Sequence, residues 1–331
     1  MLRLIGQRLL IFVPMLFAIS VLSFVIIQLP PGDYVETYIL NLQNMGGIPF
    51  VDATHLAEQL RDRYALDKPI LVQYYIWMKN IVTAGDFGIS FALDRPVADI
   101  LGERVPRTMG IALASIALSW LIAVPIGIYS AVRQYSVLDY IFTFVGFAGL
   151  SFPPFLFAIV LVYIIFIYTG WAITGIFSPA FEDAPWSVAK FWDLLKNMSI
   201  PMIVLSTAGA APLIRILRAT LLDELNKQYV VTARSKGLRE TRLLLKYPVR
   251  MAINPLISTI GWILPAAIGG EIVVSLVLNL PTVGPILLSS VLNQDMYLAG
   301  GILFMLSSLT LLGTLISDLL LVALDPRIRY E

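Results

Sequence analysis

Long uncharged, apolar runs alternate with polar segments along this chain. Six such runs occur, at Leu9 to Leu29, Thr108 to Val132, Tyr140 to Phe181, Asn197 to Ile214, Met251 to Gly270 and Met296 to Ser317. A helix needs about 20 apolar residues to cross the hydrocarbon core of a bilayer. The third run is about twice that length, but its prolines and tryptophans favour a single crossing with the rest along the membrane interface. The pattern therefore predicts an all-α integral membrane protein with six transmembrane helices.

The composition agrees with a membrane protein and excludes several other classes. Of the 331 residues, 58% are hydrophobic and 14% are charged, whereas ordinary soluble domains carry about 25% charge. The formal net charge of +1 gives no overall attraction toward nucleic acid. The absence of cysteine excludes disulfides, thiol catalysis and thiolate metal sites. The single histidine, His55, has no second ligand in view, so no metal site is expected.

The distribution of lysine and arginine predicts the orientation of the chain, because positive residues in short loops favour the cytoplasmic side. A cytoplasmic N-terminus places fourteen of the 23 Lys and Arg residues on that side, namely Arg3, Arg8, Arg133, the nine from Arg215 to Arg250, Arg327 and Arg329. We therefore expect both termini in the cytoplasm. The predicted parts are an N-terminal transmembrane helix (1–30), an extracytoplasmic segment (31–107), a five-helix membrane core (108–325) with a cytoplasmic loop (223–250) and a cytoplasmic tail (326–331).

Two polar segments interrupt the apolar pattern. The extracytoplasmic segment has helical patterning at Ala57 to Tyr64 and at Ile70 to Val82. The second polar segment is the loop 223–250, which is rich in basic residues. Its pattern fits either an amphipathic connector that rests on the membrane or a docking surface for a soluble partner, and the pattern alone leaves both open.

Within the loop 223–250, two short helices are predicted. Apolar residues at helical spacing indicate a first helix, with Asp223 and Glu224 at its N-terminal end. Gly237 follows basic residues and is typical of the position just after a helix C-terminus. A second helix is expected from Glu240 to Lys246.

The same loop carries a motif. Its residues are Thr232-Ala233-Arg234-Ser235-Lys236-Gly237-Leu238, then Arg250 with Asn254-Pro255-Leu256. This stretch resembles the cytoplasmic loop of ABC-importer membrane subunits, in the form used by the oligopeptide, dipeptide and nickel branch. The broader importer pattern has a glutamate where Val231 stands and Ile-x-Leu-Pro where this chain has Tyr247-Pro248-Val249-Arg250. Both departures are similar to what this branch shows.

Further segments resemble the same branch over nearly the whole chain. They are Arg8-Leu9-Leu10 through Pro30-Pro31-Gly32-Asp33, Tyr64-Ala65-Leu66-Asp67-Lys68-Pro69, Gln73-Tyr74, Gly85-Asp86-Phe87-Gly88-Ile89-Ser90, Arg95-Pro96-Val97, Asn279-Leu280-Pro281-Thr282-Val283-Gly284 and Leu324-Asp325-Pro326-Arg327-Ile328-Arg329. The resemblance implies the fold of type I ABC importers in the inner membrane, with an extracytoplasmic helical insertion between the first and second transmembrane helices.

The resemblance also implies a division of labour among several chains. The loop would act as a coupling helix on a separate ATPase, and the expected contact residues are Tyr229, Thr232, Ala233, Arg234, Lys236, Gly237 and Leu238. The sequence contains no G-x-x-x-x-G-K-[ST] phosphate-binding loop, so ATP and Mg are expected on that ATPase and not on this chain. The expected partners are a second homologous permease, two ABC ATPase subunits and an extracytoplasmic solute-binding protein. The implied substrates are oligopeptides, with oligosaccharides or nickel as alternatives.

One carboxylate within the fifth apolar region is the main candidate inside the membrane. Glu271 is costly there unless it has a function or a partner. In the family the glutamate of this helix aligns with Ser275, one turn away on the same helical face. We therefore expect Glu271, Ser275 and Asn279 along the translocation path, with Glu271 left facing lipid or an open groove unless a second permease covers it. The alternative is a structural carboxylate, paired with the partner subunit or satisfied by backbone near Gly269 and Gly270.

Two other functional classes compete with an importer subunit. A stand-alone proton- or ion-coupled transporter usually shows relays of intramembrane carboxylates and internal repeats, whereas this sequence has one central carboxylate and no repeat. A membrane-embedded hydrolase would need a serine elbow, an H-E-x-x-H motif or paired aspartates within a span, and none occurs. The importer subunit remains the prediction.

Overall fold

The structure is a computed structural model that describes residues 2–28, 58–59, 61–62, 65, 67–171 and 175–324. Within these residues the chain is helical apart from connecting segments and one hairpin of two-residue strands. The residues group into two compact units, one made of 1–106 with 285–311 and the other of 107–284 with 312–331. The prediction of an all-α protein is confirmed.

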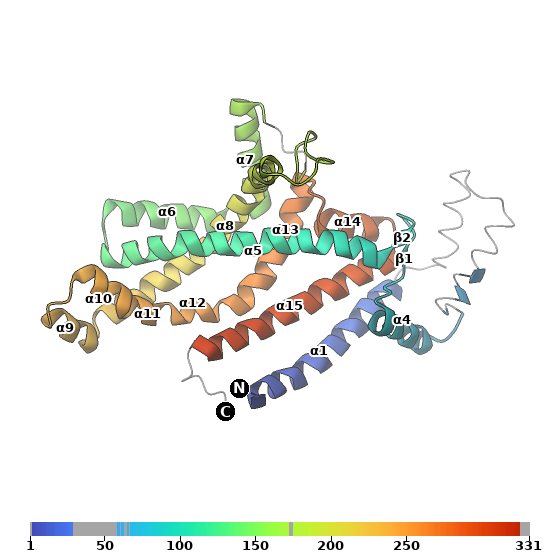
Figure 1. Cartoon of the computed structure of the whole chain (residues 1–331), viewed down its shortest axis with the longest axis horizontal. Coiled ribbons are helices and arrows are strands. Elements are labelled where there is room, and N and C mark those ends of the chain that lie inside the picture. The colour runs from blue at the N-terminus through green and yellow to red at the C-terminus, as the bar shows by residue number, and fades with distance from the viewer. Residues whose placement is uncertain are drawn as a thin grey trace. The chain divides into compact units, whose positions relative to one another are not determined.

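In the first unit, helices α1 (Leu2–Gln28) and α4 (Ile70–Ala84) lie beside each other (Figure 1), and they contact through aromatic and polar side chains. Helix α4 begins after Pro69 and ends at Gly85, whose φ of 64° is a left-handed conformation that favours glycine. The predicted helix at Ile70 to Val82 is therefore confirmed, while the one expected at Ala57 to Tyr64 falls mostly outside the described residues.

A buried aspartate fixes the hairpin of this unit. Strands β1 (Ile89–Ser90) and β2 (Arg95–Pro96) pair antiparallel. Asp295 accepts hydrogen bonds from the Ser90 hydroxyl at 2.5 Å and from the Ala92 backbone N–H at 3.1 Å. It also accepts the backbone N–H of Leu298 at 3.3 Å. Because Asp295 directly precedes α15 (Met296–Leu324), one carboxylate both caps that helix and holds the hairpin against it.

The second unit is a helical bundle around the long helix α8 (Val188–Leu225). The side chain of Ser187 caps its N-terminus by accepting the backbone N–H of Lys190. Helices α6 (Val137–Ser151) and α7 (Pro154–Thr169) both pack against α8, as does α13 (Ile260–Leu278). The remaining long helix, α5, spans Val97–Val132.

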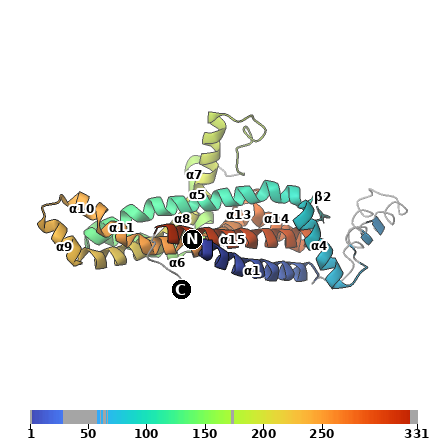
Figure 2. The ribbon, with the colours of Figure 1, turned by 60° about the horizontal axis from the view of Figure 1, so that its bottom comes forward.

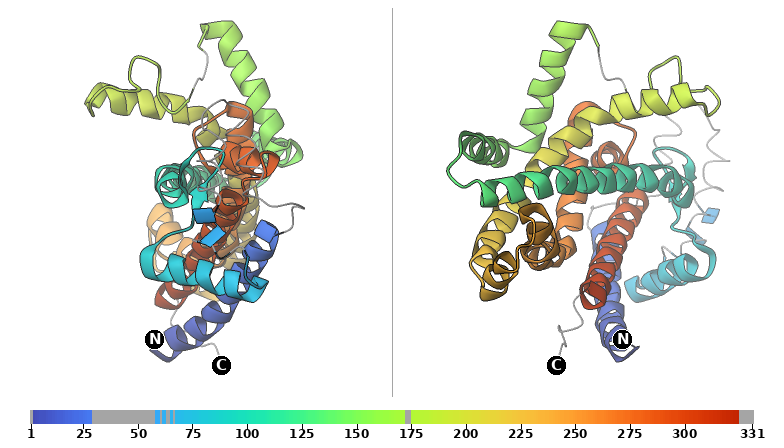
Figure 3. Two further views of the ribbon diagram at one scale, coloured as in Figure 1. Left: turned by 90° about the vertical axis from the view of Figure 1, so that its right-hand side faces the viewer. Right: turned by 60° about the vertical axis from the view of Figure 1, so that its left-hand side comes forward.

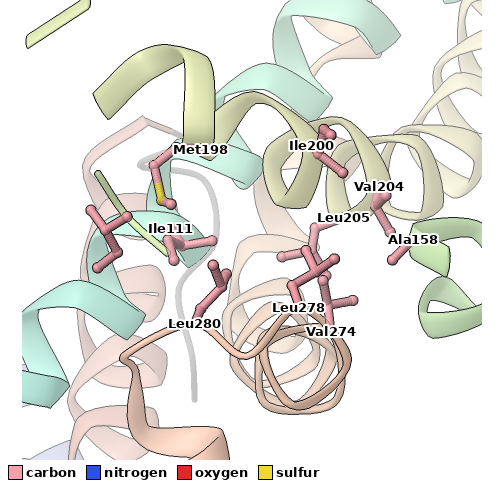
Figure 4. Close-up of a cluster of buried hydrophobic side chains, with 10 residues drawn as sticks. Ile111, Ala158, Met198, Ile200, Val204, Leu205, Val274, Leu278 and Leu280 are labelled. Atoms are coloured by element: carbon pink, nitrogen blue, oxygen red, sulfur yellow. The ribbon is translucent and has the colours of Figure 1, made fainter. Parts of the chain in front are cut away.

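The bundle is held by two apolar clusters. One joins α7, α8 and α13, and in Figure 4 Leu205, Val274 and Leu278 point toward one another. The other joins α5, α8 and the short helices α11 (Pro248–Ala252) and α12 (Asn254–Ser258), which precede α13. Its fully buried members include Leu213, Leu217 and Leu221, three residues on one face of α8 at helical spacing. A single stripe on α8 therefore organises much of this unit.

The third apolar run forms two helices. Helix α6 ends at Ser151 and α7 begins at Pro154, and the two run in different directions (Figure 3). Two consecutive prolines at the junction remove backbone donors, which explains the break. Helix α7 ends at Gly170 with a φ of 67°. The run thus provides helices of 15 and 16 residues, each shorter than a straight span of about 20.

The other runs correspond to helices that could cross a membrane. Within the described residues, α1, α5, α8 and α15 are long and apolar enough, and the bent pair Glu240–Ser258 with Trp262–Leu278 gives a fifth candidate. In the fifth run the main helix lies further along the chain than expected. The apolar run stops at the charge of Glu271, but α13 continues to Leu278. An integral membrane fold with several apolar helices is therefore confirmed.

Candidate functional site

The loop 223–250 is compact and begins with a sharp turn at the end of α8. Helix α9 spans Gln228–Ser235 and α10 spans Glu240–Lys246, and they lie beside each other next to α11 (Figure 2). The prediction of α10 is confirmed at both ends. The expectation that Asp223 and Glu224 begin the first loop helix is wrong, because both belong to the last turn of α8.

A tyrosine links this turn to α9. The Tyr229 hydroxyl donates a hydrogen bond to the Glu224 carboxylate. Burial and this carboxylate raise the pKa of Tyr229 to about 12, so the hydroxyl stays protonated and remains a donor at neutral pH. The contact holds the start of α9 against the end of α8.

The two loop helices share a small apolar core. Val230 and Ala233 on α9 pack with Leu243 on α10, and all three are buried. Leu238 and Tyr247 pack against them from the connecting segments. The loop is therefore a folded hairpin of helices with an apolar core of its own.

The turn between α9 and α10 depends on Gly237. Its φ is 72°, and its backbone N–H donates to the Arg234 carbonyl oxygen at 3.0 Å. The prediction that Gly237 terminates the helix is confirmed. Across the same turn Arg234 Nη2 donates to Glu240 Oε1 at 2.7 Å. The Arg234 guanidinium lowers the pKa of Glu240, so this exposed pair stays ionised at neutral pH.

The loop is anchored to α8 by α11 and α12. Val249, Ala252 and Leu256 are buried in the cluster that contains the apolar stripe of α8. The Thr220 hydroxyl donates to the Ala252 carbonyl oxygen at 3.1 Å. A displacement of the loop would therefore also move α8, because the interlocking side chains resist independent movement.

An ion pair ties α6 to the same end of α8. Arg218 Nη2 lies 3.0 Å from Asp139 Oδ2, and the Asp139 side chain is only 3% exposed. The same oxygen accepts the backbone N–H of Tyr135 at 3.0 Å, where the chain turns between α5 and α6 with a φ of 64°. This pair was not predicted from the sequence, although Asp139 and Arg218 each stand close to a long apolar run.

Glu271 is enclosed within the second unit. Its side chain is 1% exposed, and neither carboxylate oxygen has a hydrogen-bond partner in the described part of the chain. The hydroxyl groups of Thr282, Thr108 and Ser275 face it, and all three residues are fully or almost fully buried. The expectation that Glu271 would face lipid or an open groove without a second chain is wrong, since this chain covers it alone.

A tight turn after α13 builds this polar pocket. Asn279 ends the helix with a φ of 48°, and Leu280 N donates back to the Ser275 carbonyl oxygen at 3.0 Å. The backbone N–H of Val283, at the start of α14 (Val283–Leu292), donates to the Thr108 hydroxyl at 3.0 Å. A Cβ on Gly284 would lie 2.3 Å from Ser275 Oγ, so this close approach requires glycine.

A cavity of about 160 Å³ lies beside this pocket between α5, α7, α8 and α13. Small and apolar residues line it, among them Gly209, Ala266 and Gly270. One wall carries Ser115, whose buried hydroxyl has no hydrogen-bond partner among the described residues. Pro154 and Pro212 both line this cavity. Because proline kinks or interrupts a helix, these residues explain why the helices leave space between them.

The expected coupling residues occupy different environments. Tyr229, Thr232, Arg234, Lys236 and Gly237 are exposed, Leu238 is half-buried and Ala233 is buried in the loop core.

Two further apolar residues on this loop, Val231 and Leu245, are exposed, and neither was among the expected contact residues. Of the expected path residues, Glu271 and Ser275 come together, while Asn279 is exposed at the following turn. No group of three or more His, Cys, Asp or Glu side chains in the described ranges could hold a metal ion.

Comparisons with known proteins cover nearly the whole chain. Residues 123–330 match the family described as binding-protein-dependent transport system inner membrane component, and residues 1–112 match its N-terminal counterpart. The chain is 35% identical to the oligopeptide transport system permease protein AppB of Bacillus subtilis, with 98% of each chain covered. It is 30% identical to the oligopeptide transport system permease protein OppB of Haemophilus influenzae and 31% identical to the glutathione transport system permease protein GsiC of Escherichia coli, over the full length of both. This chain therefore belongs to the family of inner membrane components of binding-protein-dependent transport systems.

Proposed function

We propose that this chain is one of two membrane subunits of an ATP-driven importer for oligopeptides or similar small peptides. Family membership carries the importer function, and the relatives named for oligopeptide and glutathione transport support a peptide substrate. Oligosaccharides and nickel are the alternatives that the substrate assay must separate. ATP and Mg are assigned to separate ATPase subunits, since this sequence contains no phosphate-binding loop.

The loop 223–250 is the proposed docking site for the ATPase. Its folded core leaves Tyr229, Thr232, Arg234 and Lys236 exposed. A partner with a cleft could therefore bind a preformed shape, at little cost in conformational entropy. The continuous link from this loop through α11 and α8 to the helices around Glu271 is the observation that most supports coupling.

The proposed topology has six spans with both termini in the cytoplasm. Its parts are the N-terminal helix (1–30), an extracytoplasmic segment with a helical insertion (31–107), the permease core (108–325) and the tail (326–331). The basic loop supports this orientation, because it carries seven of the 23 lysine and arginine residues. In this topology α6 and α7 together account for one crossing.

Glu271, Ser275 and Asn279 are proposed to act at the gate of the translocation path. The enclosure of Glu271 favours a gate-stabilising group over one that contacts substrate directly. A carboxylate without hydrogen-bond partners costs stability where it lies. A rearrangement of the α13–α14 turn that gives it water or a donor would relieve this cost, which would help the gate to open.

Reconstitution tests the function. The chain should co-purify in mild detergent with a second permease and two ATPases, as detected by native mass spectrometry. Liposomes that contain this assembly should take up a labelled peptide only with ATP and the binding protein, and should take up neither a labelled oligosaccharide nor Ni²⁺. Uptake driven by a proton gradient in liposomes that contain this chain alone would refute the proposal and favour a secondary transporter.

A further inference from the structure

Helix α4 is apolar on its exposed face as well as on its packed face. Trp77 is buried at 4% exposure. On the other side Leu71, Tyr75 and Val82 are 78%, 66% and 75% exposed. The helix contains a single charged residue, Lys79. A helix with this much exposed apolar surface belongs in a protein core or in a membrane, because in water it would be an aggregation hazard.

The packed face of α4 contacts two membrane-crossing helices well below their ends. The Tyr74 hydroxyl lies 2.7 Å from the hydroxyl of Ser20 on α1. The Trp77 ring lies 5.7 Å from the ring of Phe24 on α1 and 5.9 Å from that of Phe304 on α15. In Figures 1 and 2 α4 lies beside the end of α1. These contacts fix how deep α4 lies.

The depth follows from helix geometry. Ser20 lies eight residues before the end of α1, and Phe304 lies eight residues after the start of α15, which is about 12 Å along each helix. The apolar spans of these helices run from Leu10 to Gln28 and from Met296 to Leu319, so the hydrocarbon boundary on this side lies near Gln28 and Met296. The contacts of α4 with Ser20 and Phe304 therefore lie about 12 Å below that boundary.

Polar groups are placed at the two ends of α4. Asp67 and Lys68 precede it, and Gly85 ends it just before Asp86. Lys79 lies on the exposed side, where a long side chain can reach the headgroups while its stem stays among apolar atoms. Polar residues at both ends and one long basic side chain between them fit a helix that lies among lipids close to the headgroups.

We propose that α4 lies in the leaflet at which α1 ends, with Leu71, Tyr75 and Val82 in contact with lipid acyl chains. The helix is then part of the membrane domain and not of a water-exposed extracytoplasmic surface. The proposal uses the depth of α4 relative to α1 and α15, so it holds whichever solute is transported.

Spin labels can test this proposal directly, because the chain has no cysteine to remove. Single variants Leu71→Cys, Tyr75→Cys and Val82→Cys would carry a nitroxide in the full chain, reconstituted in liposomes with the subunits that co-purify with it. Leu10→Cys on α1, 75% exposed, is the reference for lipid, and Ala92→Cys on the hairpin is the reference for water. Collisions with oxygen and with a water-soluble nickel complex are then compared.

Labels on α4 should match the Leu10 label, with frequent collisions with oxygen and few with the nickel complex. The collision rates of the α4 labels should also stay unchanged when the solute-binding protein is added. A match to the Ala92 label would overturn the proposal and make α4 a water-exposed surface. Protection from both reagents, or protection that requires the binding protein, would also overturn it, because a protein would then cover this face.

Discussion

Replacement of Gly237 should separate ATP hydrolysis from transport. A β-branched side chain at a φ of 72° costs about 1–2 kcal/mol of backbone strain. No atom lies within 4 Å of the position that a Cβ would occupy, so backbone strain is the whole effect. An energy of this size shifts the equilibrium between the formed and the opened α9–α10 turn by about 5–30-fold. In Gly237→Val the docking surface would therefore be misplaced while the membrane helices keep their packing.

The assay is uptake and ATP hydrolysis by the reconstituted transporter, measured on the same preparation. Gly237→Val should lower the number of solute molecules transported per ATP, with an unchanged melting temperature of the membrane domain. Gly237→Asn should stay close to the parent, because asparagine tolerates the left-handed conformation. Gly85→Val is a matched control at the end of α4, where φ is 64° and a Cβ would also meet no atom. Equal coupling in the Val and Asn variants at 237, or uncoupling by Gly85→Val, would refute the reasoning.

Three further predictions concern the buried charges and the topology. Glu271→Gln should leave the protein as stable or up to about 3 kcal/mol more stable in thermal unfolding, since a neutral amide costs less to bury than a carboxylate, and it should change uptake; a lower melting temperature would show that the carboxylate is paired. Asp139→Asn should cost about 2–3 kcal/mol because it leaves Arg218 without its charge partner, and an unchanged melting temperature would contradict this. Cysteines placed at Lys236 and Asp67 should react with a membrane-impermeant reagent from the cytoplasmic and the external side respectively, and labelling of position 236 from outside would overturn the topology.

The sequence predicted the loop well, because interactions between residues close in the chain determine its helices and its turn. Helix α10 has the predicted bounds, and Gly237 ends α9 in the left-handed conformation. The start of α9 was predicted too early because Asp223 and Glu224 fit a helix N-terminus by charge. In the structure they extend α8, whose buried stripe continues to Leu221 and carries the helix past them. Tertiary packing thus overrode a weak electrostatic preference.

The surroundings of Glu271 could not be predicted from local pattern. The pocket is made by Ser275 one turn away, by Thr282 beyond a tight turn and by Thr108 at a distant part of the chain. Only the fold of the α13–α14 turn, with its close approach at Gly284, brings these hydroxyl groups together. The signal present in the sequence was the Asn279 to Gly284 motif, which marks a turn but does not show what it packs against.

The enclosure of Glu271 changes the physical case for a second permease. An exposed carboxylate in the membrane would have demanded a covering subunit, but this chain already buries it. The case now rests on α13, where Trp262, Val273 and Val277 remain 49%, 43% and 39% exposed on the helix that carries Glu271. A solute path needs walls on all sides, and in the proposed path α13 would supply only one of them. The apolar character of that face suits a neighbouring helix better than it suits water, so a second membrane subunit packed there would complete the path and leave Glu271 behind the wall as a support.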